Sequence, residues 1–293
     1  MSARRLRQLL RGGDLIVAPG VFDGISGSLV ARAGFSAAYM TGAGVSASGF
    51  GLPDIGLLTL TEMVERARVL VGVLGEVPLI ADADTGYGSP INVVRTVREY
   101  ERAGVAAVQL EDQVFPKRCG HLAGKEVVDA EMFATAVRAA VEAREDPDLV
   151  VIARTDALAE GGVEEAIRRA ILYEQEGADV IFIEAPESVE DIERIAAEVS
   201  APLLLNIVPG GRTPELPAER LAELGFAIVI HPGAGLAPAV RAMRDAYLSM
   251  LPGASAEKVP PTPEGFFDMF GFQAWEALGR RYGVAADKRE PTP

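Results

Sequence analysis

Short runs of apolar residues recur along the chain at intervals that fit alternating strands and helices. Eight of them are nearly continuously apolar, as expected for parallel strands that are buried on both faces. The eight runs are LIVAPG from Leu15, SAAYMTG from Ser36, VPLIADAD from Val77, VAAVQLED from Val105, LVVIARTD from Leu149, DVIFIEAP from Asp179, PLLLNIVP from Pro202 and FAIVIHPG from Phe226. Segments between them, such as INVVRTVREYERAG, have apolar residues at helical spacing. This alternation predicts an α/β fold, a (β/α)8 TIM barrel over residues 1–250, with a doubly wound parallel sheet as the alternative.

The pattern changes at both ends of this region. The start, MSARRLRQLLRGGD, predicts a short amphipathic helix that ends near Gly12 and lacks the apolar core of a signal peptide. Residues 251–293 begin as a Pro-rich connector and continue as a helical tail containing FFDMFGFQAW. Because this stretch is too apolar for a free tail, we expect it to pack on the barrel or on a neighbouring subunit. It favours a homo-oligomer, a dimer or a tetramer.

Composition narrows the class of protein. The 293 residues are 49% hydrophobic, enough for a large core, and carry a formal charge of −14. That charge argues against non-specific nucleic-acid binding but permits an anionic small molecule in a locally cationic pocket. A single cysteine suits a reducing cytoplasm, and two histidines with one cysteine cannot form an ordinary zinc site. Residues 33–53 are uncharged but rich in Gly and Ser, so we expect a loop rather than a membrane span.

Polar residues follow several of the apolar runs, where a turn residue is the ordinary expectation. They are Asp82, Asp84, Glu111, Asp112, Arg154, Asp156, Glu184, Asn206 and His231. In a barrel the carboxyl ends of the strands converge on one mouth, where active sites lie. Acidic residues outnumber basic ones in this set, and a bound cation would balance them. We expect His231, which has no evident partner, to be structural.

A divalent cation fits the acidic residues. Asp82 and Asp84 are two residues apart, so on a strand they would face the same side. With Glu111 on the next strand they predict a site for Mg²⁺ or Mn²⁺, which prefer oxygen ligands and retain several waters.

The segment TGAGVSA, residues 41–47, contains a loose dinucleotide-binding pattern. SGFGLPD rather than a helix is expected next, so the Rossmann interpretation fails. Two interpretations stay open: a turn whose amides bind an anion, and a flexible strand-exit turn.

Taken together, these motifs resemble one enzyme family. DADTGYG, LEDQ, PKRCGH, IARTDA and EAP, in this order on successive strands, are similar to the isocitrate lyase/phosphoenolpyruvate mutase superfamily, and GLPD and NIVPGGRTP extend the match. The KRCGH stretch resembles short lyases acting on 2-methylisocitrate, dimethylmalate and other 2-hydroxy dicarboxylates. It also resembles a mutase acting on carboxyphosphoenolpyruvate. In this family C-terminal helices are exchanged between subunits, which implies such an exchange here.

The resemblance implies roles for individual residues. Asp82 and Asp84, with Glu111 through water, would hold Mg²⁺. The substrate would be bound by Thr41, Gly42, Ala43, Asp54, Arg154, Glu184 and Asn206. Lys117, Cys119 and His121 would lie on a loop after the fourth strand, with Cys119 as the general acid. We expect its cationic neighbours, Arg118 included, to lower the pKa of the Cys119 thiol.

The implied reaction is cleavage of a carbon–carbon bond in a 2-hydroxy di- or tricarboxylate, which gives a 2-oxo acid and a carboxylate. Tyr39 and Glu111 are both candidates for the base. The alternatives are phosphorus–carbon chemistry, as in a mutase or a phosphonopyruvate hydrolase, and a barrel that binds 2-oxo acids without turnover. Pro209 stands where many relatives have glutamate, and Gly233 where a larger residue is common, so we expect the distal half of the substrate to differ from methylisocitrate.

Overall fold

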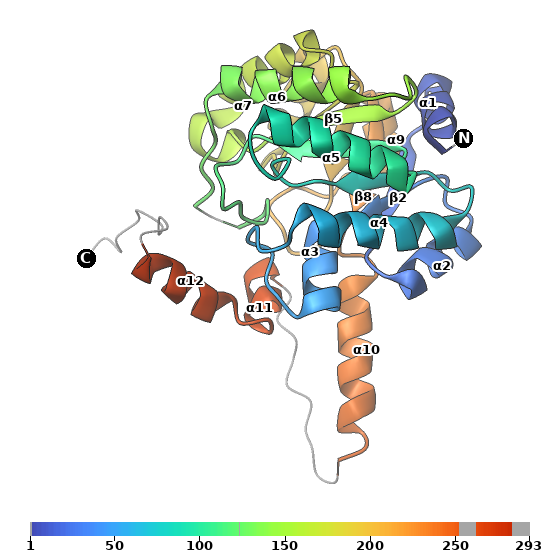
Figure 1. The fold of residues 1–293 in the computed structure, drawn as a ribbon, viewed down its shortest axis with the longest axis vertical. Helices are drawn as coiled ribbons and strands as arrows, with labels where there is room; N and C mark the ends of the chain where they lie inside the picture. Colours follow the sequence, from blue (N-terminus) through green and yellow to red (C-terminus); the bar gives the residue numbers. More distant parts are fainter. Residues whose placement is uncertain (1, 123, 252–261, 283–293) are drawn as a thin grey trace.

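Eight parallel strands close into a barrel in which each strand pairs with the next and β1 pairs with β8 (Figure 1). The computed structural model describes residues 2–122, 124–251 and 262–282. The strands are β1 Ile16–Val21, β2 Ala38–Met40, β3 Leu79–Asp82, β4 Ala107–Glu111, β5 Val150–Thr155, β6 Val180–Ile183, β7 Leu203–Asn206 and β8 Phe226–His231. The prediction of a (β/α)8 barrel is confirmed, and the doubly wound sheet is excluded.

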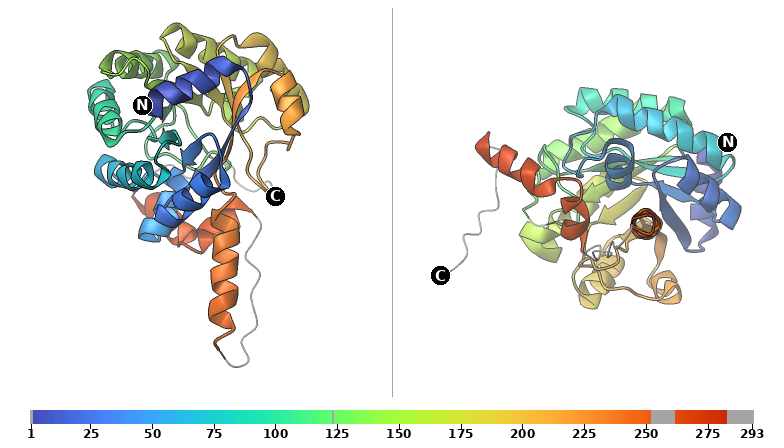
Figure 2. Two further views of the ribbon diagram at one scale, coloured as in Figure 1. Left: turned by 90° about the vertical axis from the view of Figure 1, so that its right-hand side faces the viewer. Right: turned by 90° about the horizontal axis from the view of Figure 1, so that it is seen from below.

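Helices surround the barrel and extend beyond it. They are α1 Ser2–Gly12, α2 Gly24–Ala33, α3 Gly42–Val45, the π-helix η1 Ser46–Phe50, α4 Leu60–Leu74, α5 Pro90–Ala103, α6 Ala130–Ala143, α7 Leu158–Gln175, α8 Val189–Glu198, α9 Ala218–Glu223, α10 Leu236–Leu248, α11 Pro263–Asp268 and α12 Phe272–Arg281. Helix α1 lies across the end of the barrel where the strands begin (Figure 2), and its Leu6 is fully buried in the barrel interior.

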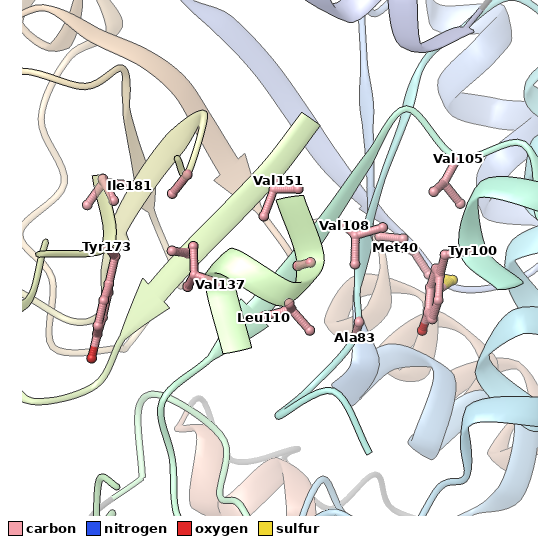
Figure 3. Close-up of a cluster of buried hydrophobic side chains, with 14 of the residues drawn as sticks. Met40, Ala83, Tyr100, Val105, Val108, Leu110, Val137, Val151, Tyr173 and Ile181 are labelled. Atoms are coloured by element: carbon pink, nitrogen blue, oxygen red, sulfur yellow. The ribbon is translucent and has the colours of Figure 1, made fainter. Parts of the chain in front are cut away.

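Alternation along each strand separates two cores. Inward-facing residues such as Ile80, Ile152 and Phe182 fill the barrel. Their neighbours, such as Val108 and Val151, pack against the helices, where Tyr100 and Tyr173 are buried (Figure 3). Since side chains alternate along a strand, the residue two positions after an inward apolar side chain also faces inward. This rule determines which polar residues reach the mouth of the barrel.

The C-terminal helices leave the barrel and return to its mouth. Helix α10 projects away from the barrel, whereas α11 and α12 lie back beside the mouth (Figures 1 and 2). Phe267 and Phe272 are buried there against Leu122, so the apolar tail packs on the barrel of its own chain. Most of the predicted Pro-rich connector, residues 252–261, and residues 283–293 lie outside the described residues. Among the helices of the described ranges, none is long and apolar enough to cross a membrane.

Candidate active site

Polar side chains continue the inward-facing rows at the carboxyl ends of five strands, β2, β3, β5, β6 and β7. Each follows an inward apolar residue by two positions: Asp82 after Ile80, Arg154 after Ile152, Glu184 after Phe182, Asn206 after Leu204, and Thr41 after Tyr39. All five polar residues are buried. Strand alternation therefore gathers them into one layer above the apolar interior.

The two predicted metal-binding aspartates meet through a turn rather than along a strand. Strand β3 ends at Asp82, and Asp84 follows in the left-handed region with a φ of 47°. The Asp84 amide donates a hydrogen bond to Asp82 Oδ1 (3.1 Å), and the Gly42 amide donates to Asp82 Oδ2 (3.1 Å). The expectation that strand pleating aligns the two aspartates was wrong, although both lie at the mouth.

These acids sit in a site with excess negative charge. Among the described residues, six buried carboxylates face three buried cations: Asp54, Asp82, Asp84, Glu111, Asp156 and Glu184 against Lys117, Lys125 and Arg154. Burial raises the pKa of Asp82 from 3.8 to about 6, and the charge of Asp84 adds to the rise. Burial also raises the pKa values of Asp84 and Glu111. A divalent cation would relieve this surplus.

Unpartnered oxygens fit a cation that retains water. Among the residues that the structure describes, Glu111 Oε1 is buried without a hydrogen-bond partner. Asp84 Oδ1 also lacks a hydrogen bond of acceptable geometry, although Lys117 Nζ lies 2.8 Å away as an ion pair. No group of three or more His, Cys, Asp or Glu within the described ranges could hold a metal directly. The donor set therefore fits Mg²⁺ with Asp82 and Asp84 close by and Glu111 acting through water.

Arg154 is the central cation of the mouth. Its Nε and Nη2 donate to the Asp156 carboxylate (2.9 and 3.0 Å), and its Nη1 lies 3.2 Å from Glu111 and 3.5 Å from Glu184. Its guanidinium lies over the Phe182 ring, 5.2 Å from the centroid. Three carboxylates thus fix one guanidinium at the cavity.

His121 and Asn206 converge on Glu184. The backbone amide of Arg212 donates to His121 Nδ1 (3.1 Å), so neutral His121 carries its proton on Nε2 and donates it to Glu184 Oε1 at 3.1 Å. Asn206 Nδ2 donates to the same oxygen (3.2 Å). Burial acts to raise the pKa of Glu184, but Arg154 and His121 outweigh it and hold the pKa below its ordinary value.

Lys117 and Cys119 lie on the segment after β4. We call residues 113–122 and 124–126 the Cys119 loop. Lys117 is buried in a short ion pair with Asp54 and a second one with Asp84. Burial raises the pKa of Cys119 to about 12, and the charge of Asp54 adds to this, against the weaker effect of Lys117. The expectation of a lowered thiol pKa was wrong, because burial dominates and because two aspartates pair with Lys117. The thiol stays protonated.

The segment after β2 forms a helix. Thr41 caps α3 by accepting from the Gly44 amide (3.3 Å), and η1 continues the helix to Phe50. The expectation that no helix follows TGAGVSA was therefore wrong. The Gly42 amide is occupied by Asp82, whereas Ala43 stands at the second helical position, where amides have no acceptor within the helix.

These residues surround one cavity of about 330 Å³. Of the predicted site residues, Tyr39, Thr41, Ala43, Asp54, Asp82, Lys117, Cys119, His121, Arg154 and Asn206 line it. Gly42, Asp84, Glu111 and Glu184 stand immediately behind this lining through the contacts given above. Pro209 and Gly233 also line the cavity, together with Phe266 and Phe267 of α11. The structure thus brings the predicted residues together around one cavity, and these four residues make another part of its lining apolar.

Other polar residues from the sequence lie elsewhere. Asp112 faces the helices and pairs with Arg169 of α7 (3.1 Å). Arg118 pairs with Glu276 of α12 (2.6 Å), and His231 is absent from the cavity lining.

Sequence reasoning missed three residues. Gln109 accepts a hydrogen bond from the Tyr39 hydroxyl (2.9 Å), and Lys125 pairs with Asp156 (2.6 Å). Arg241 of α10 lines the cavity, and within the described ranges no carboxylate pairs with it. Strand alternation could have identified Gln109, because it lies two residues before Glu111. No motif in the sequence around Arg241 indicated a role in the site.

Comparison with known proteins agrees with this geometry. The phosphoenolpyruvate phosphomutase family profile matches residues 6–251. The chain belongs to the isocitrate lyase/phosphoenolpyruvate mutase superfamily. Within this superfamily, the chain is 49% identical over 249 residues to 2,3-dimethylmalate lyase of Eubacterium barkeri, covering 85% of the chain and 86% of that relative. It is 41% identical over 274 residues to 2-methylisocitrate lyase of Aeropyrum pernix, covering 92% and 88%.

A solved structure also matches. Oxaloacetate acetylhydrolase in complex with 3,3-difluorooxalacetate superposes with a TM-score of 0.83 at 41% identity, covering 97% of this chain and 98% of the other. The prediction of an enzyme of this superfamily is confirmed.

Proposed function

We propose that the protein is a Mg²⁺-dependent carbon–carbon lyase that cleaves a 2-hydroxy di- or tricarboxylate into a 2-oxo acid and a carboxylate. One observation carries the proposal: a protonated thiol, Cys119, lines the same cavity as Asp82 and Arg154. The likeness to dimethylmalate and methylisocitrate lyases supports it.

The cavity has two chemically distinct ends. Asp82, Arg154 and the Ala43 amide form a polar end suited to the hydroxyl and carboxylate of a 2-hydroxy acid, where Mg²⁺ would supply charge and lower the pKa of the substrate hydroxyl. Phe266 and Pro209 line the other end, which suits alkyl substituents. Arg241, which pairs with no carboxylate among the described residues, offers a cation for a second carboxylate.

The chain's own groups account for the proton transfers. A base removes the hydroxyl proton, the adjacent carbon–carbon bond breaks, and its electron pair stays on the carbon next to the departing carboxylate. Cys119 donates its thiol proton to that carbon. The resulting thiolate is reprotonated from the base through solvent, which restores both groups.

Glu111 fits the base better than Tyr39. Burial and the charge of Asp82 raise the pKa of Tyr39 well above its ordinary value, and its hydroxyl proton is donated to Gln109. Burial raises the pKa of Glu111 as well, which makes its carboxylate more basic, and Glu111 Oε1 has no partner. Because Glu111 stands behind the cavity lining, the proton would reach it through a water molecule.

The assembly and the location are parts of the same proposal. Helix α10 projects from the barrel with Met243 and Tyr247 exposed, which supports a homo-oligomer, a dimer or a tetramer. The single cysteine supports a cytoplasmic location.

A substrate screen with Mg²⁺ tests the function. The panel contains C4–C7 2-hydroxy dicarboxylates, oxaloacetate and phosphonopyruvate, with release of a 2-oxo acid as the readout and a chelator as the control. We expect chelator-sensitive cleavage of a 2-hydroxy dicarboxylate. A phosphorus–carbon product detected by phosphorus NMR would instead favour mutase or hydrolase chemistry. Binding without turnover across the panel would favour the non-enzymatic alternative.

A further inference from the structure

The Cys119 loop is joined to the barrel mainly by side chains. Backbone hydrogen bonds close its neck, where Val114 donates to Glu126 (2.7 Å) and Val128 donates to Asp112 (2.8 Å). Beyond this neck, the loop's polar side-chain contacts with the barrel are ion pairs and hydrogen bonds of Lys117, His121 and Lys125, while Cys119 and Leu122 add apolar packing. The position of Cys119 therefore depends in part on a few charged contacts.

Lys125 makes one of these contacts with a residue outside the cavity. Its Nζ lies 2.6 Å from Asp156 Oδ1, and both side chains are almost completely buried. The same carboxylate receives both hydrogen bonds of the Arg154 fork, at 2.9 and 3.0 Å. Asp156 is absent from the cavity lining. One carboxylate thus neutralises a cation of the cavity and a cation of the loop.

We propose that Asp156 is a positioning residue that couples the orientation of Arg154 to the seating of the Cys119 loop. Asp156 also anchors itself, because its backbone amide donates to Asp112 Oδ1 (2.9 Å). Burial acts to raise the pKa of Asp156, but Arg154 and Lys125 outweigh it and lower the pKa, so the carboxylate stays charged.

Removing the charge of Asp156 would affect both partners. Arg154 and Lys125 would face each other, buried, without a shared counter-charge, and an uncompensated buried charge is strongly destabilising. Lys125, at the end of a loop, is the freer of the two to leave. Asp156→Asn should therefore release the loop and loosen Arg154. Lys125→Gln should release the loop alone, because the Arg154 fork remains on Asp156.

Cys119 is the chain's only cysteine, so its alkylation reports the seating of the loop without any assay of activity. In metal-free protein, we expect both variants to react with iodoacetamide at least about tenfold faster than wild type, as expected for the loss of one buried charged contact. Calorimetry with oxalate and Mg²⁺ reports Arg154: the affinity should fall about tenfold in Asp156→Asn and much less in Lys125→Gln. The double variant should react no faster than Asp156→Asn, because both changes break the same contact.

Controls separate this role from general destabilisation. Arg194→Gln removes a surface cation paired with Glu164 and should leave both readouts unchanged. Asp156→Glu retains the charge and should restore slow alkylation in part. Should Asp156→Asn fail to fold, Lys125→Gln still decides: unchanged alkylation in that variant overturns the coupling. Equal loss of oxalate affinity in both single variants also overturns it. The alkylation result does not depend on the proposed lyase activity. A failure of the Asp156 proposal can therefore be distinguished from a failure of the proposed lyase function.

Discussion

Gly120 should be essential because the Cys119 loop rests directly on the charged groups of the mouth. A β-carbon added at Gly120 would lie 2.5 Å from Glu184 Cδ and would also overlap Arg154 Nη2. Gly120 does not have a positive φ, so alanine is compatible with its backbone, and the close approach is the constraint. We therefore predict that Gly120→Ala prevents the loop from seating.

The size of the effect follows from which group can move. Carbon contacts are comfortable at about 3.5 Å, so the new methyl group requires a shift of about 1 Å. Arg154 is held by Asp156, and Glu184 by Asn206, so the loop must give way rather than the barrel. Misplacing a reacting group by about 1 Å costs on the order of 100-fold in rate.

Two measurements check this prediction. Steady-state kinetics should show the loss in kcat/KM, and alkylation of Cys119 by iodoacetamide should become faster. Gly72→Ala in α4 is the matched control, because no atom lies within 4 Å of its added β-carbon, and it should behave as wild type. A Gly120→Ala enzyme with unchanged kcat/KM and unchanged alkylation would refute the claim that the seated loop is the working state.

Three further predictions concern the metal, the substrate and the fold. The pKa of Asp82 is raised from 3.8 to about 6 in the folded protein, so protonated Asp82 stabilises the metal-free protein. This contribution is complete below about pH 4 and is lost as the pH rises through 6. Mg²⁺ binds the deprotonated carboxylate. The Mg²⁺-induced rise in Tm should be larger at pH 7.5 than at pH 5, and an equal rise at both would count against Asp82 as a ligand. Arg241→Gln should raise KM for dicarboxylates about tenfold with kcat unchanged, as expected for the loss of a charged contact, and an unchanged KM would remove Arg241 from the site. Arg169→Met leaves Asp112 buried without its cation and should lower the free energy of unfolding by roughly 3–5 kcal/mol in urea titration, where an unchanged midpoint would contradict the assignment.

The barrel was predictable because its signal is local and repeated. Each buried strand is a short apolar run. In a strand, the polar side chain that faces the mouth comes two positions after an inward-facing apolar residue, as Ile152 and Arg154 illustrate. The turn that brings Asp84 beside Asp82 was not predictable in this way, because it depends on the left-handed backbone of Asp84 rather than on strand alternation.

The electrostatic details depend on partners far away in the sequence. The raised pKa of Cys119 follows from its burial and then from Asp54, 65 positions earlier, which also pairs with Lys117. Nothing in the sequence links Lys125 to Asp156, and only the fold brings the two side chains into contact. Arg241 reaches the cavity only because α10 begins at the mouth.

The most direct test of the account is Cys119→Ser, measured for cleavage and for binding in the same preparation. The account predicts that the variant binds Mg²⁺ and oxalate as wild type does and loses release of the 2-oxo acid from the substrate, since a serine hydroxyl is a much weaker proton donor than a thiol. Full cleavage activity in Cys119→Ser would contradict the role of Cys119 as the general acid.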